Sequence, residues 1–75
     1  MVTVNENEKL EMMDQVSSGL YILDITAQLV DVQVNDIGES TFIMEDGAQF
    51  TFTKMLFELN PMNVAHVIAR SGRYY

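Results

Sequence analysis

The sequence predicts an α+β fold with an N-terminal helix, a three- to four-stranded antiparallel meander and C-terminal helical segments. Three observations lead to this class. Apolar residues recur at helical spacing after Asn5, two β-rich runs flank residues 45–47, and Asn60-Pro61 opens a second helical pattern. The alternative is a small curved β-barrel with an N-terminal helix, in which residues 64–69 form a final strand.

The first helix is expected over about residues 5 to 17. Asn5 followed by Glu8 resembles a capping box, although Asn replaces the usual Ser or Thr. The apolar positions at helical spacing are Leu10, Met13 and Val16, with Met12 beside them. The run Ser17-Ser18-Gly19 is expected to end this helix.

The composition of residues 20–34 indicates extended chain, because Tyr, Ile, Val and Thr dominate and no helix cap appears. The alternation of apolar residues changes phase along this stretch, since one series ends at Leu29 and the next begins at Val30. A strand that switches faces needs a bulge or a sharp bend, here expected near Gln28-Leu29.

The central hairpin, residues 41–53, is predicted from the tripeptide at 45–47. Its sequence Glu-Asp-Gly suits a three-residue loop closed by a glycine in the left-handed region. This loop pairs Met44 with Ala48 and Phe42 with Phe50. One face of the hairpin then carries its aromatic residues, and the other carries threonine and glutamine, with Ile43 as the apolar exception.

A second turn of the same kind is predicted at residues 35–38, with Asn35 first and Gly38 fourth. It extends the apolar face across three strands, because both turns put Phe42 on that face. The predicted pairs are Val34 with Ser40, Gln33 with Thr41, Val32 with Phe42, Asp31 with Ile43, and Val30 with Met44.

After the hairpin, Thr53 is expected to cap a short helix over residues 54–59. Asn60 as N-cap and Pro61 as first helical residue are expected to begin the last helix. Its apolar stripe is Met62, Ala65, Ile68 and Ala69, and Ser71-Gly72 ends it.

Length, charge and residue content restrict the class of protein. The 75 residues suit a single domain, with eleven acidic and four basic residues and a net charge of −7. That charge repels nucleic-acid polymers and anionic membranes. No signal peptide or membrane span is expected, and with no cysteine the expected location is the cytoplasm. A 48% hydrophobic chain this small is expected to form a homo-oligomer, most simply a symmetric dimer. A methionine-rich surface for an obligate partner would explain the six methionines equally well.

The sequence contains no catalytic nucleophile motif, no glycine-rich loop that could bind phosphate, and no motif for a cofactor or a metal. A Ser–His–acid site would have to use His66, the single histidine, which lies on a predicted helix between Ala65 and Val67 with no serine beside it in sequence. The protein is therefore not expected to be an enzyme, and His66 is expected to be structural or to lie at an interface.

The end of the chain concentrates binding chemistry. Arginine matches phosphate oxygens and tyrosine rings stack on bases or anchor protein interfaces. In the alternative interpretation, the tail frays or its arginines pair with the protein's own carboxylates. The candidate ligand- or partner-binding residues are Arg70, Arg73, Tyr74 and Tyr75, with His66.

The first helix carries a second candidate surface, formed by the carboxylates of Glu6, Glu8, Glu11 and Asp14. These acids could bind a protein partner or imitate the phosphates of DNA, but the favoured interpretation is ordinary charge that keeps the protein in solution. The acids at the two turns lie at opposite ends of a shared strand and are not expected to form a cation site.

These features favour a small acidic, non-catalytic, oligomeric binding protein. The first hypothesis is an inhibitor or adaptor that acts on a host protein, in the manner of phage and mobile-element proteins. The second is a sponge that sequesters a phosphorylated small molecule, such as a signalling nucleotide, between protomers. A DNA-mimic inhibitor and a structural assembly component are the remaining alternatives.

Overall fold

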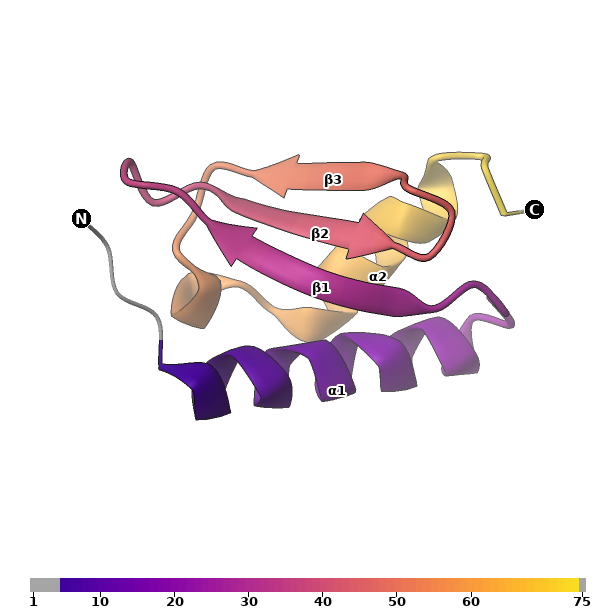
Figure 1. The fold of residues 1–75 in the computed structure, drawn as a ribbon. Helices are drawn as coiled ribbons and strands as arrows, with labels where there is room; N and C mark the ends of the chain where they lie inside the picture. Colours follow the sequence, from indigo (N-terminus) through magenta and orange to yellow (C-terminus); the bar gives the residue numbers. More distant parts are fainter. Residues whose placement is uncertain (1–4, 75) are drawn as a thin grey trace.

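The computed structural model describes residues 5–74 as two layers, an open antiparallel sheet and a pair of helices on one of its faces (Figure 1). The sheet order is β1-β2-β3, so the predicted α+β fold is confirmed and the alternative closed barrel is wrong. The elements in chain order are α1 (Glu6–Ile22), β1 (Leu29–Val34), β2 (Ser40–Met44), β3 (Gln49–Phe52), a 3₁₀ helix η1 (Leu56–Glu58) and α2 (Pro61–Arg70).

Helix α1 begins as predicted but is longer than predicted. Asn5 caps it, with the Asn5 Oδ1 accepting the N–H of Asn7 at 2.8 Å. The prediction that Ser17-Ser18-Gly19 ends the helix is wrong, because α1 continues to Ile22. Gly19 lies instead against α2, where a Cβ at this position would stand 2.9 Å from the Cβ of Ala65. The glycine permits close helix packing and does not act as a stop.

Helix α1 ends with a pair of backbone hydrogen bonds around Asp24. The N–H of Asp24 donates to the carbonyl of Tyr21, and the N–H of Ile25 donates to the carbonyl of Leu20. Asp24 has a φ of 61°, so the pattern is a Schellman motif with aspartate where glycine is usual. A Schellman motif is often accompanied by an apolar pair across the helix end, and here the buried side chains of Leu20 and Ile25 form that pair. The prediction that residues 20–34 are extended is therefore only partly right, because residues 20–22 are helical, residues 23–28 form no strand and β1 covers Leu29–Val34.

The β1–β2 register agrees with the prediction from Val34 to Asp31, including the pair Val32–Phe42. The predicted pairing of Val30 with Met44 is wrong, since Met44 pairs with Leu29 and the register shifts between Leu29 and Asp31. The bulge that the phase change required is thus at Val30, just after the predicted position at Gln28-Leu29. Both Leu29 and Val32 face the core because this extra residue separates them.

The central hairpin has the predicted register, with Phe42 opposite Phe50. The N–H of Met44 donates to the carbonyl of Ala48 at 2.9 Å, and Gly47 has a φ of 89°. The outer face of the sheet carries the side-chain pair Thr41–Thr51, whose hydroxyl oxygens lie 3.1 Å apart. Ile43 is half-buried on this face, which no helix of the described residues covers (Figure 1).

The chain after the hairpin contains a 3₁₀ turn and a helix. Thr53 is not the predicted N-cap, because η1 starts after Met55 and has no side-chain cap. Asn60 caps α2 as predicted, its Oδ1 accepting the N–H of Met62 at 2.9 Å, and Pro61 follows it. Residues 64–69 are therefore helical and form no final strand.

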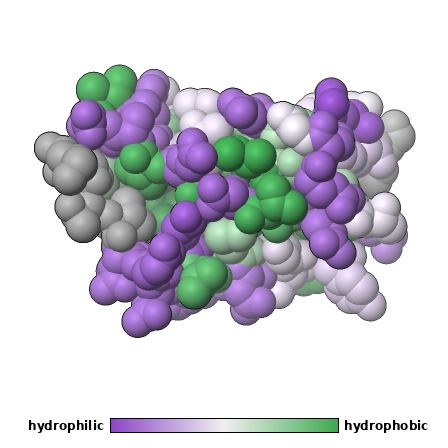
Figure 2. Space-filling model, in the orientation of Figure 1, coloured by the Kyte–Doolittle hydropathy of each residue, from purple (hydrophilic) through white to green (hydrophobic). Residues whose placement is uncertain are grey.

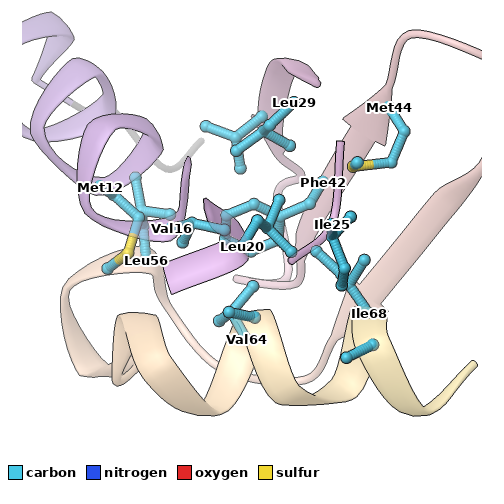
Figure 3. Packing of buried hydrophobic residues seen from close by; sticks show 13 residues of the cluster. Met12, Val16, Leu20, Ile25, Leu29, Phe42, Met44, Leu56, Val64 and Ile68 are labelled. Carbon is cyan, nitrogen blue, oxygen red and sulfur yellow. The ribbon is translucent and has the colours of Figure 1, made fainter. Parts of the chain in front are cut away.

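The core lies between the helix pair and the inner face of the sheet (Figure 3). Val16 and Leu20 of α1 and Val64 and Ile68 of α2 converge on Phe42, which is fully buried. The Phe42 ring packs edge-to-face against Phe52, with centroids 5.5 Å apart. The prediction that Leu10 belongs to the apolar stripe is wrong, since Leu10 is 58% exposed and Met12 is buried in its place.

On the face shown in Figure 2, apolar surface lies mainly over the middle of the molecule, with hydrophilic residues on both sides. Among the described residues, no helix is both long and apolar enough to cross a bilayer.

Candidate functional site

A groove of about 420 Å³ separates the end of β3 from the outer side of α2. One wall comes from Phe52 and from Lys54, which directly follows β3. The opposite wall is a helical stripe at i, i+3, i+4 and i+7, formed by Asn63, His66, Val67 and Arg70. Glu58, Leu59, Asn60 and Val64 also line this β3–α2 groove.

The sequence positions the α2 stripe through the opposite side of the helix. Val64, Ala65, Ile68 and Ala69 are buried and Met62 lies against Gly19 of α1, so Asn63, His66, Val67 and Arg70 occupy the other side of α2. Polar side chains at those positions therefore face the groove, with Val67 as an apolar member that is partly exposed.

The main chain at Lys54 is held by a buried side chain. The Ser40 hydroxyl donates to the carbonyl of Lys54 over 2.8 Å, and Ser40 is completely buried. This contact joins the first residue of β2 to the segment that leaves β3, and it fixes the point from which the Lys54 side chain extends.

The groove contains the two basic residues that have no ion pair within residues 5–74. Lys9 pairs with Asp31 at 2.9 Å and Arg73 pairs with Asp46 at 2.9 Å, whereas Lys54 and Arg70 pair with none of the described carboxylates. Glu58 is the one acidic side chain in the lining. The groove is thus a locally basic site on a protein with a net charge of −7.

The candidate binding residues predicted near the end of the chain do not lie together in the structure. His66 and Arg70 line the groove, while Arg73 and Tyr74 lie at the tip of the central hairpin, where both bind Asp46. The Tyr74 hydroxyl donates to the two Asp46 oxygens at 3.2 and 3.3 Å. Tyr75 lies outside the described residues. The alternative in which a tail arginine pairs with the protein's own carboxylate therefore holds for Arg73.

Hydrogen bonds at the hairpin tip shift the ionisation of the groups involved. The N–H of Ala48 and then the Arg73 guanidinium hold the pKa of Asp46 below its usual value. Asp46 in turn raises the pKa of Arg73. Partial burial, followed by the hydrogen bond to Asp46, raises the pKa of Tyr74. Arg73 and Tyr74 are thereby engaged internally.

The acidic surface on α1 is exposed as expected, with Glu6, Glu8, Glu11 and Asp14 all accessible. Glu8 and Glu11 border a shallow hollow of about 180 Å³ with Met12 and Gln15. The Gln15 amide donates to Glu11 at 3.3 Å. Within residues 5–74, no group of three or more histidine or acidic side chains is placed to hold a metal ion.

Of the residues that line the groove, only His66 and Arg70 were named as site residues from the sequence, and Lys54 is the basic residue that sequence reasoning missed. Its proximity to α2 depends on how the helix returns beneath the sheet, which no local pattern reveals. The spacing of Asn63, His66, Val67 and Arg70 was a usable signal, because it places polar groups opposite the buried stripe of α2.

Comparisons of this chain with protein-family models, with curated proteins and with solved structures find no match.

Proposed function

We propose that this protein is a non-catalytic binding protein that holds a phosphorylated small molecule in the β3–α2 groove. The supporting observation is the convergence of Lys54 and Arg70, the two bases without an ion pair in residues 5–74, on one cavity. A volume near 420 Å³ falls within the range of small-molecule sites.

The lining supplies complementary contacts for such a ligand. The Arg70 guanidinium can bind two phosphate oxygens at once, and the Lys54 ammonium supplies a point charge from the opposite wall. The amides of Asn60 and Asn63 offer donors and acceptors, and Phe52, Leu59 and Val67 offer apolar surface to the rest of the ligand.

Isothermal calorimetry tests this proposal with pyrophosphate and a panel of nucleotides. Arg70→Ala is expected to weaken binding roughly 10- to 100-fold, because a hydrogen-bonded charge contributes about 1.5–3 kcal/mol. Lys54→Ala should act in the same direction, and raising the salt concentration should weaken binding by the wild type.

Arg73→Ala is the matched control, since it removes the same charge at a position already paired with Asp46 outside the groove lining. Its affinity should equal that of the wild type. The absence of binding heat from every anion tested would remove the proposal, and equal losses in the Arg70 and Arg73 variants would remove the groove as the site.

A second candidate function uses the acidic surface on α1 to inhibit or adapt a basic partner protein. Leu10 favours it, because this exposed apolar side chain lies one helical turn from both Glu6 and Asp14 and offers an anchor beside their charges. Capture of a host protein that is lost both at high salt and with Leu10→Ser would support this function. Capture that neither change affects would count against it.

A further inference from the structure

A second hollow lies where α1 ends and the chain turns back toward β1, and its volume is about 390 Å³. Its described lining falls within residues 17–28, so it shares no residue with the β3–α2 groove. Leu20, Ile25 and Ala27 give this α1-end hollow its apolar surface, and the first two belong to the buried core. The size and the apolar lining are typical of small-molecule sites.

Hydrogen bonds fix the hollow at both ends. At one end the N–H of Ile25 donates to the carbonyl of Leu20 at 2.9 Å. At the other end Gln28 exchanges two hydrogen bonds with Glu45 of the central hairpin. The Gln28 carbonyl accepts the Glu45 N–H at 2.9 Å, and the Gln28 N–H donates to the Glu45 Oε1 at 3.3 Å. The hollow is therefore formed before a ligand arrives, which lowers the entropic cost of binding.

The charges around the hollow favour a cation. Asp24 lines it, and none of the four lysine and arginine residues of the chain does. Within residues 5–74, Asp24 forms no ion pair. Helix α1 also ends here without a basic residue in its last turn, so the negative end of its dipole is not neutralised. Glu45, beside Gln28, adds a second carboxylate at the far end.

Tyr21 adds an aromatic surface to the hollow. It lines the hollow and is 82% exposed, so its ring contributes little to the core. Asp24 lies next to it, because the Asp24 N–H donates to the Tyr21 carbonyl at 3.0 Å. The face of an aromatic ring attracts cations. An aromatic ring and a carboxylate that has no ion pair thus stand side by side at one hollow.

The backbone conformation of Asp24 also points to a role for its side chain. With a φ of 61°, Asp24 occupies the left-handed position at which helices usually end with glycine. The backbone hydrogen bonds of the helix end do not involve the carboxylate, so glycine would satisfy them at lower cost. Strained backbone conformations are concentrated at functional sites. A binding role for the carboxylate accounts for an aspartate at this position.

We propose that the α1-end hollow binds a guanidinium group carried on an alkyl stem, with Asp24 and Tyr21 as the recognition residues. The two carboxylate oxygens of Asp24 accept two parallel N–H groups of the guanidinium, and the Tyr21 ring stacks on its plane. The alkyl stem contacts the apolar lining around Ile25. A guanidinium fits this pair better than an ammonium, because it is planar and less strongly hydrated. This cation site is separate from the anion site proposed in the β3–α2 groove.

Two-dimensional ¹H–¹⁵N NMR of the full chain, titrated with butylguanidinium at constant ionic strength, tests the proposal. Saturable shifts are expected in the amide signals of residues 20–28 and in the ring signals of Tyr21. Butylamine has the same stem with an ammonium group and should bind more weakly. Butylurea has a similar planar group without a charge and should not bind measurably. The proposal is overturned if these signals show no saturable shift, or if butylamine or butylurea binds as tightly as butylguanidinium.

Two further ligands distinguish the sources of this chemistry. Agmatine represents a free alkylguanidine, and acetylarginine methylamide represents an arginine side chain within a peptide. Binding of either ligand at residues 20–28 supports the site, and the tighter of the two identifies its source. Failure of both ligands to bind overturns the proposal.

Three variants test the residue roles. Asp24→Asn keeps the side-chain shape, and asparagine tolerates the left-handed conformation, so the helix end should still form. It should weaken butylguanidinium binding roughly tenfold, the low end for hydrogen bonds to a charged group, because the hollow is open to water. Tyr21→Leu keeps an apolar side chain without the ring and should weaken binding roughly two- to fivefold. Asp14→Asn is the matched control, since it removes the same charge from α1 outside the hollow, and its affinity should equal that of the wild type.

Circular dichroism establishes that the variants fold. If Asp24→Asn does not, Tyr21→Leu carries the test, because this exposed position lies outside the core. Unchanged affinity in both Asp24→Asn and Tyr21→Leu overturns the proposal. Equal losses in Asp24→Asn and Asp14→Asn also overturn it, because they would show a general attraction to the net charge of −7.

Discussion

Asp24 holds a backbone conformation that glycine adopts at lower cost. Its φ of 61° lies in the left-handed region, where a Cβ is unfavourable even though aspartate tolerates it better than most residues. The conformation persists because the Schellman hydrogen bonds and the Leu20–Ile25 pair require it. Asp24 is thus a strained residue at a structural position.

Asp24→Gly is therefore expected to stabilise the protein by about 0.5–1 kcal/mol, since it removes the Cβ penalty. Chemical denaturation monitored by circular dichroism measures the change in the free energy of unfolding. Asp24→Ala is the control and should destabilise, because it keeps the Cβ and removes the polar side chain. Equal stability in both variants would contradict this account of the helix end.

Asp46 connects the hairpin tip to the tail through Arg73 and Tyr74. Its pKa is lowered in the folded protein, chiefly by the Ala48 N–H and then by Arg73. The contribution of this contact to stability is present above the unfolded pKa of about 3.9 and is lost as the pH falls through the lower folded pKa. The tail should therefore detach in acid.

An NMR titration of the Tyr74 ring signals tests this expectation, and the transition should lie below pH 3.9. At neutral pH, Asp46→Asn should increase the rate of trypsin cleavage after Arg73, because it removes the charge that holds the guanidinium. Asp36→Asn, an exposed change in the other turn, is the control, and trypsin should cleave this variant at the wild-type rate. An unchanged rate in Asp46→Asn would show that the tail is held by other contacts.

Helices α1 and α2 pack closely against each other, and this contact depends on Gly19. A Cβ there would lie 2.9 Å from the Cβ of Ala65 and 3.0 Å from the Sδ of Met62. The Met62 side chain is flexible and can move, whereas the Ala65 Cβ is fixed to the backbone of α2. The contact with Ala65 therefore decides the effect of a substitution.

Gly19→Ala is expected to destabilise the protein by about 1 kcal/mol in net terms. The gain in helix propensity is about 1 kcal/mol, and overpacking costs about 1–3 kcal/mol. Thermal and urea unfolding measure this change. In the Gly19→Ala variant, adding Ala65→Gly should recover part of the lost stability, because it removes the Cβ that crowds residue 19. Ser18→Ala, on the exposed side of α1, should be neutral or slightly stabilising. A stabilising Gly19→Ala would show that α2 moves away freely.

The hairpins were predictable at the level of elements because short local signals determine them. Gly38 and Gly47 have positive φ, and Asn35 accepts the N–H groups of Ile37 and Glu39, so the turn residues alone specify the register. The end of α1 was mispredicted because Gly19 has a packing role that becomes apparent only with α2 in place. The bulge was correctly inferred from the phase change, but its position depends on where β1 begins.

At the scale of the whole molecule, the candidate site was only partly predictable. His66 and Arg70 were correctly placed on a helix, and the structure puts both on the groove. Arg73 was separated from them because Asp46, remote in sequence, reaches it across the hairpin tip. Such pairings between distant charges follow from tertiary structure and have no signature in local sequence.

The net charge of −7 leads to a prediction for the whole molecule. Self-repulsion opposes the compact state and salt screens it, so the melting temperature should rise as sodium chloride is added at low ionic strength. A variant with Glu11→Gln and Asp14→Asn carries two fewer negative charges, so its melting temperature should rise less as salt is added. Calorimetric melts compare the two series. A melting temperature that falls with salt would show that favourable ion pairs dominate.

The contact between α1 and α2 also affects the order of events during synthesis. It joins the first and last helices of the described chain, so the side of α1 that packs on α2 at Gly19 stays uncovered while the ribosome makes the three strands. The local hairpins can form early, because their loops are short. The core closes only after residues 61–70 have left the ribosome, and until then α1 is the segment most in need of a chaperone.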